Sequence, residues 1–194
     1  MSCNSIHRLI RCSSRIGSAF YVTKTHANAL DTFHQFDAGV LGYHINLIPY
    51  FFYAPTIPIG LRYFNVSNTT SLPKVDILYS HQDQTPELFQ FAADNGADGI
   101  VYAGNGAGGI SRDARAAAEE LHNSTGTSIV TSRKVNTGFA TTRGFVIGSG
   151  FLNPVRARIF LQLGIAEGMD DEGIRDMFGG LYPDPLGLGR IPGA

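Results

Sequence analysis

The sequence predicts an α/β fold in which a parallel four-stranded sheet is flanked by helices. From Lys74 onward, short apolar runs alternate with stretches of helical periodicity, and helical crossovers of this length join parallel strands. The four expected strands are Val75–Tyr79, Gly99–Tyr102, Ser128–Val130 and Phe145–Ile147. A chain of 194 residues, 43% of them hydrophobic, has room for one domain plus part of another.

Three helices are expected between and after these strands. Thr85, Ser111 and Asn153 are placed to cap them, and Pro86 and Pro154 suit a first helical turn. The side chains expected to face inward are Leu88, Phe91 and Ala92, then Ala114, Ala117, Ala118 and Leu121, then Val155, Ile159 and Leu163. A further short helix is expected near residues 172–178.

The chain before Lys74 has a different pattern. Ala19–Val22 reads as strand-like, and the two cysteines, Cys3 and Cys12, read as thiols near a poorly ordered start. Four prolines within residues 44–73 argue against a long helix and favour a hairpin or linker. The aromatic run Tyr50–Tyr53 in this region is expected to lie in an extended strand covered by a neighbouring domain; an exposed surface for a partner is the alternative.

Composition excludes several classes of function. A formal net charge of −1 without any basic block gives no support for a nucleic-acid or polybasic membrane partner. The sequence has no transmembrane-length apolar run, no signal-peptide core and no metal-ligand spacing, and we expect no cofactor. Three N-glycosylation triplets, at Asn65, Asn68 and Asn123, are close to the number that chance produces and favour secretion only weakly.

The strongest local motif is the loop Ala103–Gly109, between a strand and a helix. Its backbone amides and the helix dipole could receive a small anionic substrate, while the glycines could equally serve only a tight turn. The spacing Gly104-x-Gly106-x-x-Gly109 also matches a dinucleotide fingerprint. No acidic residue ends the following strand, so nucleotide binding is disfavoured.

Three cationic side chains have both a functional and a structural interpretation. Lys24, between two threonines, could assist a neighbouring hydroxyl in proton transfer, although a solvated lysine is the commoner case. Arg156 and Arg158 read as the solvated face of the Asn153 helix. No Gly-x-Ser-x-Gly motif is present to suggest a serine nucleophile.

A series of short segments, taken together, resembles one enzyme family. In chain order they are Arg15–Ala19, Tyr21–Thr25, Leu41–Tyr43, Leu72–Val75, Gly99–Val101, Ala103–Gly108, Thr131–Arg133, Leu152–Pro154 and Ala157–Arg158. The family is the bacterial-type L-asparaginases (asparaginase/glutaminase). Any one segment is unspecific, but the ordered set is not. The resemblance implies an asparaginase C-terminal domain-like fold preceded by an incomplete N-terminal segment.

The resemblance also divides the chain. Residues 1–14 would be a leader or artefact, 15–43 a remnant of the N-terminal catalytic domain, and 44–73 a hairpin or linker. Residues 74–168 would form the C-terminal domain and 169–194 a tail. It further implies a homotetramer that hydrolyses L-asparagine, or L-glutamine, by attack of a threonine.

The same resemblance assigns the candidate residues. The lysine of the family's Thr-Asp-Lys group falls on Lys24, and the substrate-binding loop falls on Asn105 and Gly109. Family members often carry Asn or Ser at the position of Gly109, and some supply an acid from the segment that corresponds to residues 136–144, which here has none. No Thr-Gly-Gly-Thr occurs. We therefore expect a truncated and inactive amidohydrolase; the alternative is a non-catalytic α/β module that binds a small ligand or a partner chain.

Overall fold

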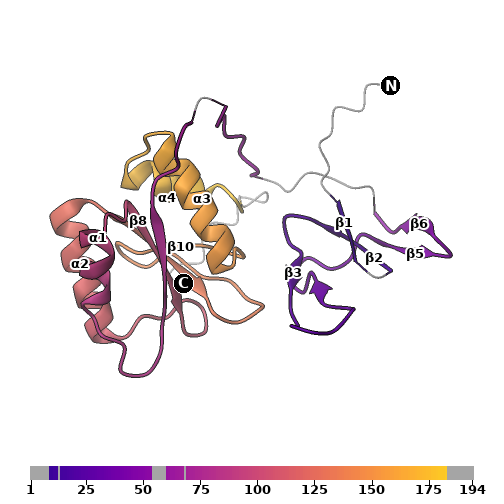
Figure 1. The fold of residues 1–194 in the computed structure, drawn as a ribbon, viewed down its shortest axis with the longest axis horizontal. Coiled ribbons are helices and arrows are strands. Elements are labelled where there is room, and N and C mark those ends of the chain that lie inside the picture. The colour runs from indigo at the N-terminus through magenta and orange to yellow at the C-terminus, as the bar shows by residue number, and fades with distance from the viewer. Residues whose placement is uncertain (1–8, 13, 54–59, 68, 183–194) are drawn as a thin grey trace, which may run out of the picture. The chain divides into compact units, whose positions relative to one another are not determined.

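The computed structural model describes residues 9–12, 14–53, 60–67 and 69–182 (Figure 1). The chain divides into two compact units, Met1–Leu61 and Arg62–Ala194. Cys3, like most of the expected leader, lies outside the described residues. In the part of the chain that is described, no helix has the length and apolar character needed to cross a membrane.

The larger unit contains the expected parallel sheet. Its strands are β7 (Val75–Tyr79), β8 (Gly99–Gly104), β9 (Ser128–Arg133) and β10 (Ile147–Gly148), in the order β10-β9-β8-β7. All three pairings are parallel. The predicted fold class is therefore confirmed. The fourth strand begins later than predicted, because the backbone of Val146 pairs with Arg143 in a turn rather than with β9.

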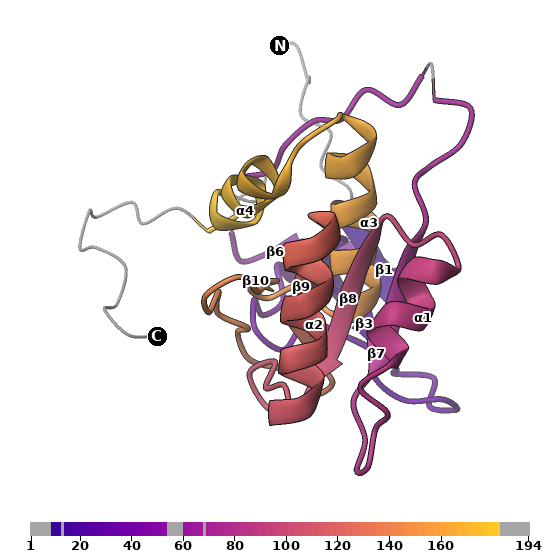
Figure 2. The ribbon, with the colours of Figure 1, turned by 90° about the vertical axis from the view of Figure 1, so that its left-hand side faces the viewer.

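Helices cover both faces of this sheet. Figure 2 shows α1 (Leu88–Asp94) and α2 (Arg112–Thr125) in front of it and α3 (Pro154–Ala166) behind it. The fourth helix, α4 (Asp171–Gly179), packs against α3 and β10. The predicted caps of α2 and α3 are confirmed: the Ser111 side chain accepts from the Ala114 amide, and Asn153 accepts from the Arg156 amide.

Successive residues of β8 face opposite sides of the sheet, and this explains how helices pack on both sides. Ile100 and Tyr102 belong to the core shared with α1 and α2. Gly99 faces α3, where a Cβ would lie 2.9 Å from the Ile165 side chain. Glycine at this position therefore lets α3 approach the sheet closely.

The first helix differs from its prediction. It begins at Leu88 without a side-chain cap, and the carbonyl of Thr85, the predicted cap, accepts from the Leu88 amide in a preceding turn. Phe89 is fully buried, whereas Phe91 is 59% exposed. The ring of Phe89 stacks on that of Tyr102, and this contact, rather than helical periodicity, decides which aromatic side chain faces inward.

The predicted inward face of α3 is also wrong. Val155 and Ile159 are 55% and 47% exposed. The buried residues of the helix are Pro154, Ala157, Phe160, Leu161, Gln162 and Gly164. Because apolar residues surround much of this helix, their spacing did not distinguish its two sides.

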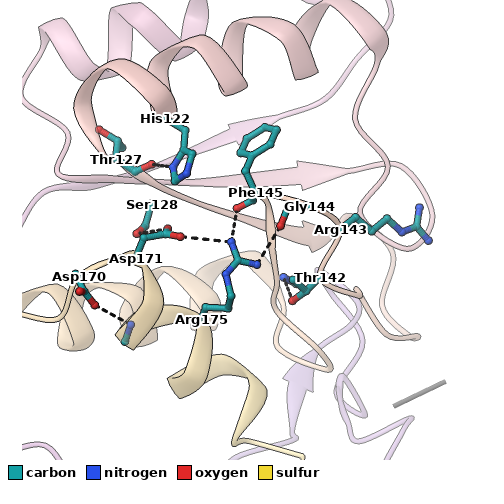
Figure 3. Close-up of polar contacts among 12 residues, drawn as sticks. His122, Thr127, Ser128, Thr142, Arg143, Gly144, Phe145, Asp170, Asp171 and Arg175 are labelled. Atoms are coloured by element: carbon teal, nitrogen blue, oxygen red, sulfur yellow. Dashed lines mark hydrogen bonds and ion pairs between the residues drawn. The ribbon is translucent and has the colours of Figure 1, made fainter. Parts of the chain in front are cut away.

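Polar contacts fasten α4 to the sheet at the amino ends of the strands (Figure 3). Arg175 donates to the carbonyl oxygens of Gly144 and Phe145, at 3.1 and 2.8 Å, and lies 3.4 Å from the Asp171 carboxylate. The Ser128 hydroxyl donates to that same carboxylate at 2.9 Å. The short helix expected in the tail is thus present and joined to the domain.

The smaller unit is antiparallel. Strands β1 (Leu9–Cys12), β2 (Arg15–Ser18), β5 (Gly42–Ile45) and β6 (Ile48–Phe51) form one sheet in the order β1-β2-β5-β6. Strands β3 (Thr23–Lys24) and β4 (Phe33–His34) form a separate pair. The predicted strand at Ala19–Val22 is instead a turn, in which the Ser18 carbonyl accepts from the amides of Tyr21 and Val22.

The hairpin of β5 and β6 carries the aromatic run. Asn46 and Leu47 form its turn with positive φ values of 49° and 68°, as tight hairpins require. All four side chains of Tyr50–Tyr53 are exposed within this unit. The hairpin therefore presents an apolar surface that its own unit does not cover.

The observed buried face of α3 predicts that two substitutions of similar size lower the free energy of unfolding by different amounts. Leu161→Ala should lower the free energy of unfolding by about 2–5 kcal/mol, because the side chain is fully buried against β8. Ile159→Ala should change it by less than about 0.5 kcal/mol, because Ile159 lies on the exposed side. Urea unfolding of both variants measures the difference; equal losses would contradict the observed face.

Candidate functional site

The carboxyl ends of β7, β8 and β9 bring three loops together at one edge of the sheet. Ser80 follows β7, Asn105 follows β8 and Lys134 follows β9. The Ser80 amide donates to the Ala103 carbonyl at 3.0 Å, and the Lys134 amide donates to the Gly104 carbonyl at 3.2 Å. These bonds continue the sheet pairing past the strand ends. Ligand sites of open parallel sheets lie at this edge.

The glycine-rich loop after β8 is closed on itself. The backbones of Asn105 and Gly109 exchange two hydrogen bonds, of 3.1 and 2.7 Å. A Cβ on Gly104 would lie 2.5 Å from the Gly109 carbonyl oxygen, and one on Gly108, whose φ is +84°, would lie 2.6 Å from the Thr131 hydroxyl. Glycine at positions 104 and 108 is therefore a steric requirement of this turn.

Two of the three candidate residues thus come together. Asn105 is exposed at the start of the loop and Gly109 is half-buried at its end. The φ of Gly109 is not in the left-handed region, and a Cβ there would lie 3.2 Å from the nearest atom, the Asn105 carbonyl oxygen. This one contact is tight, so a small side chain at this position requires the Asn105 carbonyl to shift by a few tenths of an ångström, and no other atom lies within 4 Å.

Side chains from the neighbouring loops hold Asn105 in place. The Ser80 hydroxyl donates to Asn105 Oδ1 at 3.3 Å. Lys134 Nζ donates to the Ser80 carbonyl oxygen at 2.8 Å, and so joins the loop after β9 to the loop after β7. Three loops from three strands are connected through these contacts.

A buried phenol lies beneath this group. Tyr102 is 1% exposed, and its hydroxyl donates to Gln84 Oε1 at 2.9 Å. Burial raises the pKa of Tyr102, and a hydrogen bond with Ser80 opposes this rise. A phenol is protonated at neutral pH even at its ordinary pKa, and here its hydroxyl anchors the loop between β7 and α1 as a donor to Gln84.

The end of β9 is joined to the start of α3. The buried Arg133 side chain donates to the carbonyl oxygens of Phe151 and Asn136, at 2.8 and 3.2 Å. The adjacent Ser132 hydroxyl donates to the Leu152 carbonyl at 2.8 Å. These bonds fix the loop that leads from β10 into α3.

The expected solvated roles of Arg156 and Arg158 are wrong. Both side chains are half-buried. Arg158 Nε donates to the Val75 carbonyl oxygen at 2.7 Å, at the start of β7. Burial lowers the pKa of Arg156, and nearby Arg133 lowers it further, while Tyr182 acts in the opposite direction. Both arginines therefore belong to the packing of α3.

Lys24 belongs to the smaller unit. It lies in β3 with an exposed side chain, paired through its backbone with Phe33 of β4. The next residue, Thr25, donates through both its amide and its hydroxyl to the Thr32 carbonyl, at 2.7 and 2.9 Å. The turn after Lys24 is thus well braced, and the side chain projects from a short two-stranded ribbon.

Among the described residues, no group of three or more His, Cys, Asp or Glu is placed to hold a metal ion. The groups that reach the loop edge are instead hydroxyls, an amide, an ammonium and backbone groups. Such a set can bind and orient a small polar molecule.

Ser80, Tyr102 and Lys134 were not among the sequence-based candidates. Their signal is positional, because the carboxyl ends of parallel strands share one edge. Tyr102 ends a predicted strand and Ser80 follows one, while Lys134 follows β9, which extends to Arg133, beyond its predicted end at Val130. The contacts that join these loops are not visible in the sequence, because 25 residues separate Ser80 from Asn105 and 54 separate it from Lys134.

Comparison with known proteins is consistent with this fold. Residues 74–178 match the family described as Glutaminase/Asparaginase C-terminal domain. A solved structure of a probable cytoplasmic L-asparaginase from Campylobacter jejuni superposes with a TM-score of 0.81 at 33% identity, covering 89% of this chain and 57% of that one.

Two curated yeast relatives are similar over most of the chain. Probable L-asparaginase 1 of Schizosaccharomyces pombe is 42% identical over 170 residues, which is 88% of this chain and 47% of that protein. L-asparaginase 2-3 of Saccharomyces cerevisiae is 41% identical over 181 residues, or 90% of this chain and 50% of that protein. The chain spans about half the length of the curated relatives that it matches.

The contact between Lys134 and Ser80 predicts a measurable contribution to stability. Lys134→Met keeps the aliphatic stem but removes the donor to the Ser80 carbonyl, and should lower the free energy of unfolding by about 1 kcal/mol. Arg112→Met removes a cation from an exposed position of α2 and should have a smaller effect. Urea unfolding compares the two, and equal changes would argue against a specific role for the Lys134 contact.

Proposed function

This chain belongs to the glutaminase/asparaginase family, and we propose from that premise that it serves an L-asparaginase-type amidohydrolase. The reaction would convert L-asparagine into aspartate and ammonia. The observation that carries the proposal is the closed loop of Asn105 and Gly109, held at the carboxyl edge of a parallel sheet. A preorganised loop is suited to bind a small polar substrate without a cost of ordering it.

The loop would contribute to substrate binding rather than to bond breaking. Asn105 offers an amide, and the chain around Gly109 offers backbone groups, all of which can bond the charged amino and carboxylate ends of an amino acid. Ser80 and Lys134 would keep Asn105 oriented through the contacts described above. L-Glutamine, one methylene longer, is the second substrate that fits this chemistry.

The chemistry itself would be acyl transfer to a threonine. A threonine Oγ attacks the side-chain amide carbon of the substrate, ammonia leaves after it gains a proton, and water then hydrolyses the ester. Lys24 would support the proton transfers that activate the hydroxyl. A short, braced ribbon such as β3 and β4 would limit the movement of that ammonium group.

The 194 residues contain no Thr-Gly-Gly-Thr, the motif near which the family's nucleophile is expected. We therefore propose that these residues hydrolyse no asparagine unless that segment is supplied. The alternative is a non-catalytic module that binds a small ligand or a partner chain. The exposed aromatic side chains of Tyr50–Tyr53 favour a protein partner, and we propose a second copy of the chain, in a homo-oligomer, as that partner.

A complementation experiment tests the catalytic proposal. The 194-residue chain alone should release no ammonia from L-asparagine above a heat-treated control. Mixed with the front half of a relative such as probable L-asparaginase 1 of S. pombe, it should do so. Lys24→Met should then lower kcat by about 100-fold or more, since general acid–base groups contribute on this scale.

Lys74→Met is the matched control in the complemented enzyme. Lys74 bonds the Asn95 carbonyl and pairs with Asp76, at the opposite ends of the strands from the candidate loop, so turnover should be retained. Steady, Lys24-dependent turnover by the 194 residues alone would refute the requirement for a separate threonine segment. A Lys24→Met variant that stays fully active would remove Lys24 from the mechanism.

Gly109 gives a separate test of the proposed binding role. Gly109→Ser adds a hydroxyl on a Cβ whose one near neighbour is the Asn105 carbonyl oxygen, at 3.2 Å, and one new hydrogen bond to the substrate is worth about 1 kcal/mol. We expect KM for L-asparagine in the complemented enzyme to fall about fivefold, with kcat little changed. Gly109→Ala, which adds the Cβ without the hydroxyl, should leave KM near its original value. Equal effects of the two variants would mean that the loop does not contact the substrate.

A further inference from the structure

Two of the three N-glycosylation triplets lie entirely within the described residues, and they differ in conformation. Asn65-Val66-Ser67 lies in an irregular segment before β7, and Asn123-Ser124-Thr125 ends α2. The third begins at Asn68, which lies outside the described residues. Both described asparagines are exposed, so exposure alone does not distinguish them.

The first triplet is folded so that its hydroxyl bonds its own asparagine. The Ser67 hydroxyl donates to Asn65 Oδ1 at 2.6 Å, and the Ser67 amide donates to the same oxygen at 3.2 Å. Two donors on Oδ1 polarise the carboxamide, and neither of these bonds uses its nitrogen. The hydroxyl two residues after the asparagine is the group that the modification motif requires.

Contacts made by the residues on either side of this turn keep the turn exposed. Before it, the ring of Phe64 packs edge-on against Phe160 of α3 at 5.6 Å, and Arg62 pairs with Glu167 at 3.2 Å. After it, the Thr69 amide donates to the Val66 carbonyl at 3.1 Å. These contacts fix the chain on both sides of the triplet, whose three residues are exposed. A bulky group attached there would displace no packed side chain.

The hydroxyls of the second triplet are bonded within α2. The Thr125 hydroxyl donates to the Leu121 carbonyl at 2.7 Å, and the Ser124 hydroxyl donates to the Glu120 carbonyl at 2.8 Å. The hydroxyl that the motif requires is therefore bonded to the preceding turn and not to Asn123. A transferase could use this triplet only after the end of α2 had unwound.

We propose that Asn65 is an acceptor for an N-linked oligosaccharide, and that the folded chain is not modified at Asn123. The co-substrate is an oligosaccharide on a lipid pyrophosphate. The side-chain nitrogen of Asn65 bonds to C1 of the first sugar, the bond from C1 to the phosphate oxygen breaks, and the lipid pyrophosphate leaves with that electron pair. One amide proton passes to a basic group of the transferase. No electron transfer is required.

The attached sugar would cover an exposed apolar stretch. Tyr63 is 84% exposed and Val66 is 46% exposed, on either side of the acceptor. A hydrophilic group at Asn65 would shield both, which reduces the tendency of the segment to associate.

The test uses the folded 194-residue chain, a purified oligosaccharyltransferase and a lipid-pyrophosphate oligosaccharide, with an acceptor peptide as a positive control. Peptide mass spectrometry should detect a glycopeptide at Asn65 and none at Asn123. Ser67→Ala should abolish the Asn65 glycopeptide, while Ser67→Thr, which keeps the hydroxyl, should retain it. Thr125→Ala should leave modification of Asn65 unchanged.

Two results would overturn the assignment of Asn65 as an acceptor. One is an unmodified Asn65 in a reaction that modifies the control peptide. The other is modification of Asn65 that persists in full in Ser67→Ala. Equal occupancy of Asn65 and Asn123 in the folded chain would refute the selectivity that the fold predicts. Circular dichroism of each variant before the reaction establishes that the comparison is made between folded proteins.

Discussion

The pairing of β8 with β7 on one side and β9 on the other determines where the candidate residues of the larger unit lie. All six residues of β8 are buried, and its register with both neighbours is continuous. Side chains on one face of β8 contact α1 and α2, and Gly99 on the other face admits α3. Because the three strands end at one edge, the loops that follow them lie within hydrogen-bonding distance of each other.

This arrangement places the contacts that stabilise the fold and the candidate functional residues at opposite ends of the strands. The amino ends of the strands carry the Arg175 and Asp171 contacts that fasten α4. The carboxyl ends carry Asn105 and Lys134, which are exposed, and the buried Ser80 that contacts both. A rigid sheet that presents its variable groups on loops is a common way in which α/β domains combine a stable core with a binding edge.

Much of this fold could be predicted, and the errors have physical causes. β-Branched runs and the caps Ser111 and Asn153 are local signals, and the structure confirmed both. The buried face of α3 was mispredicted because that helix is apolar on several sides, so that the approach of the helix to Gly99 decides the outcome. The Lys134 contact was missed because a lone lysine carries no pattern. Lys24, by contrast, lies between two threonines and matches a family motif, but no observed contact tests its role, which stays a proposal.

The hairpin of the smaller unit has a consequence for how the chain could associate. Strand β6 lies at the edge of its sheet and has apolar side chains on both faces. It also contains Pro49, which has no backbone amide to donate and therefore interrupts any further strand that would add along this edge. Side chains can still pack against another surface, but an unlimited cross-β ladder is disfavoured. The β6 edge of this hairpin is thus a poor template for growth by strand addition.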